Sequence, residues 1–149
     1  MTRTIAIRTI AVLLVGGLLL SACGTQSLST AMKTWTSESS YTANNKTLIN
    51  DARHSATALG IAAEGVNQLH TVCGVMLYES EEANAALPTP DHLVNSLLSK
   101  AYGSLGAGAN VCYAAGTDSA KRTRALNYLS KGVGLLAEAS AQIKSDLSS

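Results

Sequence analysis

Apolar residues recur at alternating intervals of three and four along most of this chain of 149 residues. Side chains at such intervals share one face of a helix, so the spacing predicts helices that bury one side. The first stripe has nine members, one of them polar: Leu48, Ala52, Ser55, Leu59, Ala62, Val66, Leu69, Cys73 and Met76. We expect one long helix over this stripe, capped by Asn44 or Asn45, with Gly74 as a candidate break.

Two more stripes follow, and residues that stop a helix separate them. Pro88 and Pro90 forbid a helix across that point, and Asp91 is a good N-cap, so the chain turns and restarts there. The second stripe is Val94, Leu98, Ala101, Leu105, Gly108 and Cys112. Thr117 or Asp118 can cap the last helix. The third stripe is Leu126, Leu129, Val133, Leu136, Ser140, Ile143 and Leu147.

The composition agrees with closely packed helices. The apolar residues are mainly Ala, Leu and Val, and the chain has no Phe, one Trp and two Pro. Such a sequence suits helices better than a sheet, and the spacing of Leu28, Met32 and Trp35 adds a short helix near the N-terminus. Helices joined by short connections run antiparallel. We therefore expect an all-α fold over residues 28–149: an antiparallel helical bundle of three long helices plus one short N-terminal helix.

The first 22 residues have the order of a bacterial secretory signal. Arg3 and Arg8 precede an apolar run over residues 10–20 that is too short to span a bilayer, and small residues follow. An uncleaved membrane anchor is the alternative. The sequence Leu20-Ser21-Ala22-Cys23 resembles the lipobox of bacterial lipoproteins. This resemblance implies that residues 1–22 are removed, that Cys23 carries a diacylglycerol thioether, and that residues 23–27 form a tether.

Acyl chains on Cys23 would hold the protein on a membrane, because each buried methylene contributes roughly 0.8 kcal/mol. The expected location is the extracytoplasmic face of the cell membrane. Loss of Arg3 and Arg8 would leave nine basic residues against ten acidic ones, a net charge of −1. A charge so close to zero provides no electrostatic surface for nucleic acid, so we expect no nucleic-acid partner.

The other two cysteines are expected to pair, because exported proteins meet an oxidising compartment. A simple turn at the two prolines would place Cys73 opposite roughly position 105, about 10 Å from Cys112 at 1.5 Å per residue. A disulfide needs Cα atoms near about 5.5 Å. Residues 87–90 in extended form can recover most of that offset. We therefore predict a disulfide between Cys73 and Cys112 that closes the bundle; two free buried thiols are the alternative.

The chain offers little for catalysis or metal binding. Ferritin-like metal sites need a Glu followed three residues later by a His, and no Glu here has that neighbour. His54, His70 and His92 are therefore expected to be solvated or hydrogen-bonded. No Gly-x-Ser-x-Gly motif is present, and the glycine-rich residues 103–108 lie within a helical stripe, which favours close packing over phosphate binding. We predict no enzyme activity, no metal and no cofactor.

Four tyrosines are the candidates for ligand binding: Tyr78, Tyr102, Tyr113 and Tyr128. They can line a groove, or they can fill the core with their hydroxyls reaching water. Glu79, Glu81 and Glu82 form an acidic patch, and Lys121-Arg122-Thr123-Arg124 forms a basic one. Each patch is either a solvated helix end or a contact for a partner.

Several features together resemble small actinobacterial, mycobacterial-type lipoproteins with helical ectodomains. They are the lipobox, Trp35 before a Ser/Thr-rich stretch, Asp51-Ala52-Arg53, the Leu87-Pro88-Thr89-Pro90-Asp91 turn and the two later cysteines. The resemblance implies a place in the cell envelope and no particular reaction. Our leading hypothesis is an envelope protein that binds a protein partner without catalysis. The alternatives are a carrier of a small apolar ligand or lipid in an inter-helix cavity, and a phage-type superinfection-exclusion lipoprotein.

Overall fold

A computed structural model describes residues 26–61 and 65–149, and the described residues form helices and no strand. The helices are α1 (Leu28–Glu38), α2 (Tyr41–Gly60), α3 (Val66–Ala85), α4 (His92–Tyr113) and α5 (Ser119–Ser148). The predicted all-α fold is confirmed. Residues 1–22 and the acylation site at Cys23 lie outside the described residues.

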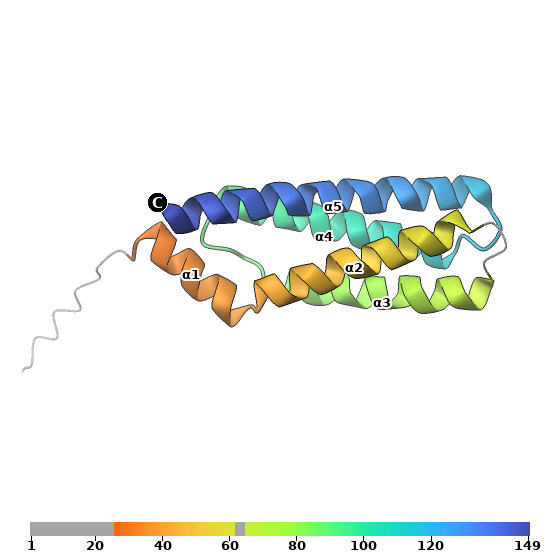
Figure 1. The fold of residues 1–149 in the computed structure, drawn as a ribbon, viewed down its shortest axis with the longest axis horizontal. Helices are drawn as coiled ribbons and strands as arrows, with labels where there is room; N and C mark the ends of the chain where they lie inside the picture. Colours follow the sequence, from red (N-terminus) through yellow and green to blue (C-terminus); the bar gives the residue numbers. More distant parts are fainter. Residues whose placement is uncertain (1–25, 62–64) are drawn as a thin grey trace, which may run out of the picture.

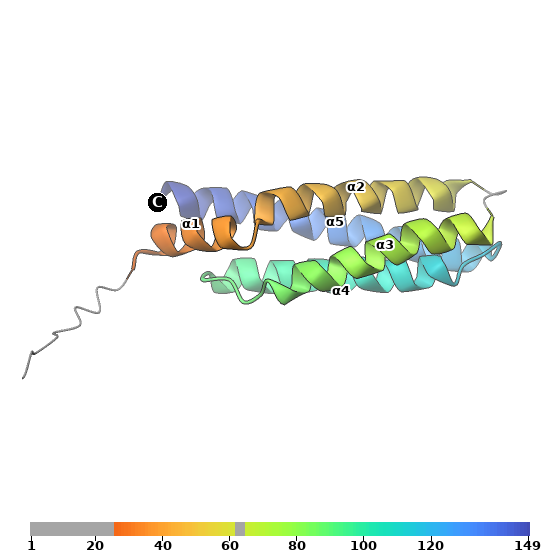
Figure 2. The same ribbon diagram turned by 90° about the horizontal axis from the view of Figure 1, so that it is seen from below.

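Helices α2 to α5 run up and down as an antiparallel bundle (Figure 1). Helix α4 packs against both α3 and α5, and α2 packs against α3 and α5, which closes the ring of four. Helix α1 lies at the end of the bundle where α5 ends, and it packs mainly on α5 (Figure 2). One end of the bundle therefore carries α1, the C-terminus and the connection between α3 and α4.

The number of helices differs from the prediction of three long helices and one short one. The expected long helix between Leu48 and Met76 is two helices, α2 and α3, folded back on each other. Helix α2 ends at Gly60, Ile61 is extended, and Gly65 is the N-cap of α3. No atom lies within 4 Å of where a Cβ would stand on Gly60 or Gly65. These glycines flank a chain reversal and do not serve close packing, and Ala62 lies outside the described residues.

The starts of the helices test the predicted caps. Asp91 accepts a hydrogen bond from the backbone N–H of Val94 at 2.7 Å, so it caps α4 as predicted. Asp118 caps α5 by accepting from the backbone N–H groups of Ala120 and Lys121. The predicted cap at Asn44 or Asn45 is wrong, because α2 begins earlier, at Tyr41. Ser40 precedes it with a φ of 51°, in the left-handed region, and this separates α1 from α2.

Helices α4 and α5 form the most closely packed pair. A Cβ on Gly108 would lie 2.9 Å from Leu129 Cδ2, and a Cβ on Gly132 would lie 2.5 Å from Leu105 Cγ. Each helix thus receives a leucine of the other at a glycine. This confirms the packing role expected for the end of the glycine-rich segment.

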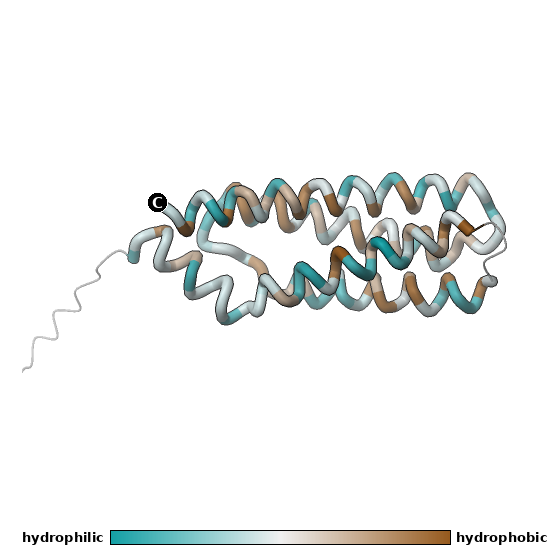
Figure 3. Tube along the Cα trace, viewed as in Figure 1, coloured by the Kyte–Doolittle hydropathy of each residue, from teal (hydrophilic) through white to brown (hydrophobic). Residues whose placement is uncertain are grey.

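The predicted stripe of α5 is buried in part: Leu129, Leu136 and Ile143 are in the core as predicted, but the other buried positions lie one residue before their predicted neighbours. The innermost small residues of α5 are Ala125, Gly132 and Ala139. The predicted Leu126, Val133 and Ser140 are only partly buried. Hydrophobic and hydrophilic positions alternate along each helix of the bundle (Figure 3), but hydropathy alone does not show which apolar position is innermost. Small residues take that position because they let α4 approach closely.

Cys73 of α3 and Cys112 of α4 form a disulfide, with a Cα–Cα distance of 5.9 Å. Both cysteines are fully buried. Residues 86–91 run past the end of α3 before α4 begins (Figure 1), and this brings the two cysteines level. The predicted disulfide is confirmed. The predicted break at Gly74 is wrong, because Gly74 lies inside α3 next to the bridge.

Candidate functional site

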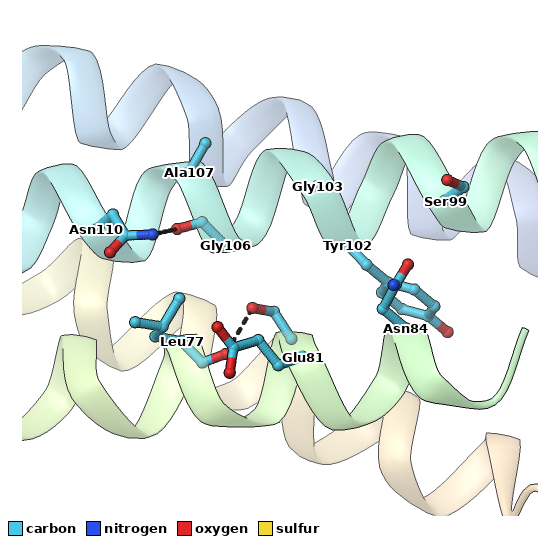
Figure 4. A pocket seen from close by; sticks show the side chains of 10 residues that line it. Leu77, Glu81, Asn84, Ser99, Tyr102, Gly103, Gly106, Ala107 and Asn110 are labelled. Carbon is cyan, nitrogen blue, oxygen red and sulfur yellow. Dashed lines mark hydrogen bonds between the residues drawn. The ribbon is translucent and has the colours of Figure 1, made fainter.

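A groove of about 430 Å³ lies between α3 and α4 (Figure 4). Figure 4 shows Glu81 between the two helices, with Asn84 and Tyr102 at one end and Asn110 toward the other. Asn110 donates to the backbone carbonyl of Gly106 at 3.2 Å, which satisfies its amide within its own helix. The groove is an open polar cleft with a floor of small residues.

The four candidate tyrosines lie in different surroundings. Tyr102 is 5% exposed and lines the groove between α3 and α4. Burial raises its pKa well above the ordinary value, and the charge of Tyr41 raises it further. Tyr78, Tyr113 and Tyr128 are exposed, and none of them lines this groove. The structure therefore does not bring the four tyrosines together in one cavity.

Two of the exposed tyrosines have partners near or on α3. The ring of Tyr113 stacks on the ring of His70, with centroids 4.0 Å apart and planes 6° from parallel. The hydroxyl of Tyr78 donates to Glu82 Oε1 at 2.7 Å, and this hydrogen bond raises the pKa of Tyr78. Tyr113 thus extends the surface of α3 with a side chain from the end of α4.

We call the solvent-exposed side of α3, together with Tyr113 beside it, the α3 face; its exposed apolar and aromatic side chains are Val66, Val75, Tyr78 and Tyr113, of which Val75 also lines a groove with Asp51 and His54 of α2. Val66, Val75 and Tyr113 are about half exposed, and Tyr78 is 59% exposed. Helix α3 contains three acidic residues and no Lys or Arg. Partial burial raises the pKa of Glu79, and the negative charges of Asp51 and Glu82 raise it further. The α3 face therefore combines exposed apolar and aromatic side chains with acidic ones.

A second groove, of about 280 Å³, lies between α5 and the elbow where α1 meets α2. Ser140 Oγ lies 3.0 Å from the Tyr41 hydroxyl, and it accepts a hydrogen bond from Asn45 Nδ2 at 3.3 Å. Burial raises the pKa of Tyr41 above its ordinary value. Lys144 and Leu147 also line this groove. It offers a small polar centre beside one exposed cation, with no nucleophile and base in contact.

Arg122 has a role that the sequence did not predict. It is buried, its Nε donates to the Gly116 carbonyl at 2.7 Å, and its Nη1 donates to the carbonyls of Leu59 and Ile61 at 3.1 and 2.6 Å. It joins the end of α2 to the loop between α4 and α5. The sequence signal is its position seven residues before Leu129, which continues the predicted stripe and separates Arg122 from the other members of the basic patch.

The histidines are dispersed. His54 Nδ1 lies 3.9 Å from Asp51 Oδ1 at the surface, His70 is stacked on Tyr113, and His92 is exposed at the start of α4. Within residues 26–61 and 65–149, no three His, Cys, Asp or Glu side chains are grouped so that they could hold a metal ion.

Among the described helices, none combines the length and the hydrophobicity that a bilayer crossing requires. Comparison with protein-family models, with curated proteins and with solved structures finds no match to this chain. The function is therefore inferred from the surface of the protein itself, and the exposed apolar and aromatic side chains of the α3 face are the basis for it.

Proposed function

We propose that this protein is a lipid-anchored component of the cell envelope that binds a protein partner through its α3 face. The observation that carries the proposal is the exposure of four apolar or aromatic side chains along and beside one helix that has acidic and no basic side chains: Val66, Val75, Tyr78 and Tyr113. Exposed apolar patches with polar rims mark interaction sites in soluble domains.

The chemistry of the α3 face also indicates the kind of partner. Protein interfaces place aromatic and apolar side chains at the centre and polar groups at the rim, and tyrosine is a frequent contributor of binding energy. Glu79 and Glu82 lie beside Tyr78, so the surroundings of Tyr78 are negative. We expect a partner with an apolar patch bordered by Lys or Arg.

The anchoring part of the proposal rests on the lipobox-like residues and on the short segment after them. Cys23 precedes the first residue of α1 by five positions. The Cys73–Cys112 disulfide supports an oxidising, extracytoplasmic location, because such bonds persist there. Val66 and Tyr113 belong to the end of the bundle opposite α1 (Figure 1), so an anchor at Cys23 leaves them facing away from the membrane.

The test uses photo-crosslinking residues placed at Val75, Tyr78 and Tyr128 in the membrane-bound protein, with intact-mass analysis of the mature chain. Tyr128, exposed on α5, is the matched control for Tyr78. We expect one and the same protein to be crosslinked from Val75 and Tyr78 and not from Tyr128. We also expect the crosslink at Tyr78 to disappear when Val66 is changed to Glu.

Two results would contradict the proposal. Equal crosslinking from Tyr78 and Tyr128 would show that the α3 face is no specific surface. A mature chain without acyl groups on Cys23 would refute the anchor.

The carrier of a small apolar ligand is the second candidate. It would use an inter-helix cavity, and the groove between α3 and α4 has a suitable volume of about 430 Å³. Its polar lining of Glu81, Asn84 and Asn110 suits an apolar ligand poorly, so we place it second. A stoichiometric lipid extracted from the purified protein would favour the carrier.

A further inference from the structure

We propose that the end of the bundle that carries α1 docks on the bilayer surface, with the exposed side chains of Leu28 and Leu147 among the lipid headgroups. This inference rests on the proposed lipid anchor and adds a second, non-covalent contact to it. The contact concerns the opposite end of the molecule from Val66 and Tyr113, so the two surfaces do not compete.

Two exposed leucines lie on adjacent turns at this end. Leu28 is 41% exposed and Leu147 is 40% exposed. Ser29 Oγ donates to the backbone carbonyl of Leu147 at 3.3 Å, so the first turn of α1 lies against the last turn of α5. Figure 1 shows the same meeting of α1 and the C-terminal end of α5. The end surface thus presents apolar side chains from both termini of the described chain.

The length of the tether identifies the occupant of this surface. Leu28 follows Cys23 by five residues, and five residues reach at most about 17 Å at roughly 3.5 Å each. The headgroup layer takes up about 5 to 7 Å of each leaflet. An acylated Cys23 at the base of that layer therefore keeps Leu28 within roughly 10 Å of the headgroup surface. A folded protein partner would not fit in that gap. The bilayer surface is therefore the occupant that the short tether keeps beside Leu28.

The exposed cations at this end are compatible with a lipid surface, and Asp146, the acid next to Leu147, is buried and accepts a hydrogen bond from Gln142. Lys33 and Lys144 are exposed, and Lys144 lines the same groove as Leu147. Cations near a membrane are attracted to anionic headgroups. Glu38 is the exposed acid of α1, and it lies at the far end of that helix from Leu28.

Trp35 of α1 is the only tryptophan in the chain and reports on this end. Its indole N–H donates to the carbonyl of Ala86 at 3.0 Å, so the ring is fixed relative to the bundle. We would place the lipidated protein in vesicles of phosphatidylcholine and phosphatidylglycerol that carry bromine near the headgroup. Docking predicts that these lipids quench the fluorescence of Trp35.

Lengthening the tether separates docking from mere proximity. A Gly/Ser insertion of about 15 residues after Thr25 adds a reach of roughly 20 Å. Docking predicts that quenching largely persists in this variant. Loss of quenching on lengthening alone would overturn the proposal, because the short tether would then be the whole cause.

Substitutions in the lengthened chain test the two leucines. For Leu28→Glu combined with Leu147→Glu we expect the ratio of docked to undocked molecules to fall about tenfold. Ile61→Glu is the matched control, since Ile61 is similarly exposed at the opposite end. Quenching in the double variant equal to that of the unsubstituted chain would refute the contact. Circular dichroism confirms that each variant is folded.

Failure of the anchor is distinguishable from failure of docking. Intact-mass analysis decides whether Cys23 is acylated. If it is not, the Cys23 thiol can be coupled to a maleimide-bearing phospholipid, because Cys73 and Cys112 are paired. The same quenching comparison then supports or refutes docking by itself.

Discussion

The α4–α5 hairpin and the α2–α3 hairpin share one apolar spacing, yet they are packed differently. Between α4 and α5, Gly108 and Gly132 each receive a leucine of the opposite helix. Between α2 and α3, the buried Ser55 donates to the Val72 carbonyl at 3.3 Å, and grooves of about 320 and 160 Å³ remain. The two glycines therefore let α4 and α5 interlock, whereas α2 and α3 leave grooves between them.

This difference suggests a division of work within the bundle. Helices α4 and α5 share the largest contact and form the scaffold. Helix α3 is tied to the scaffold by the disulfide between Cys73 and Cys112, and it keeps its outer side chains exposed. Because the disulfide holds α3 in place, α3 can keep some apolar side chains exposed to solvent.

The largest effect is expected from removing that covalent bond. The double substitution Cys73→Ser and Cys112→Ser opens a loop with a sequence separation of 39. The chain-entropy estimate for such a loop is about 4 kcal/mol. We expect the free energy of unfolding in urea to fall by about that amount, and amide exchange to accelerate in α3 before α4 and α5. Uniform acceleration in all helices would contradict the division between scaffold and α3.

A matched pair of glycines tests the close packing of α4 and α5. Gly132→Ala puts a methyl group 2.5 Å from Leu105 Cγ and 3.2 Å from the Ala101 carbonyl oxygen. We expect a loss of about 2 kcal/mol in the free energy of unfolding. Gly134 has no atom within 4 Å of its Cβ position, so Gly134→Ala should stabilise by about 0.5 to 1 kcal/mol through helix propensity. Chemical denaturation measures both, and effects of equal sign would argue against the glycine–leucine fit.

The pH dependence of stability tests the burial of Tyr102. Burial raises the pKa of Tyr102 above its ordinary value of 10.0. The folded state therefore keeps the phenol proton after the unfolded chain has lost it, and stability falls as the pH rises above that value. The slope from this residue is about 1.4 kcal/mol per pH unit. We expect Tyr102→Phe to reduce the slope of the free energy of unfolding above pH 10.0; an unchanged slope would contradict the prediction.

The smallest effect on stability is expected on the α3 face. Val75→Ser removes an apolar side chain that is about half exposed. We expect the free energy of unfolding to change by no more than about 0.5 kcal/mol, while the partner crosslink at Tyr78 is lost. A large loss of stability would show that Val75 belongs to the core and not to an interaction surface.

Local chemistry explains which parts of the fold were predictable. Asp91 and Asp118 bond the backbone a few residues away, so their caps are visible in the sequence. The reversal between Gly60 and Gly65 was missed because both helices bury a face in the same core. The apolar intervals therefore continue across the loop. In α5 the buried Leu129, Leu136 and Ile143 were predicted, but the small buried residues between them were missed, because hydropathy does not distinguish small residues that face a neighbouring helix.

The surface was less predictable than the core. Tyr78 and Tyr113 were among the candidate residues, but nothing in their spacing indicates that they lie on one face. Tyr113 lies against α3 by stacking on His70, a contact between residues 43 positions apart. The burial of Arg122 likewise depends on carbonyls at the end of α2, which the packing of the whole bundle supplies.

The hydrogen bond from Ser29 to the Leu147 carbonyl joins the two termini of the described chain. Any sequence fused after Ser149 will therefore emerge beside the point from which the chain leaves for Cys23. A reporter that must stand clear of the bilayer belongs instead in the loop over residues 114–118, at the other end of the rod. A pulling force applied between the two termini would therefore break the contacts between α1 and α5 in sequence, beginning with the turns that carry Ser29 and Leu147.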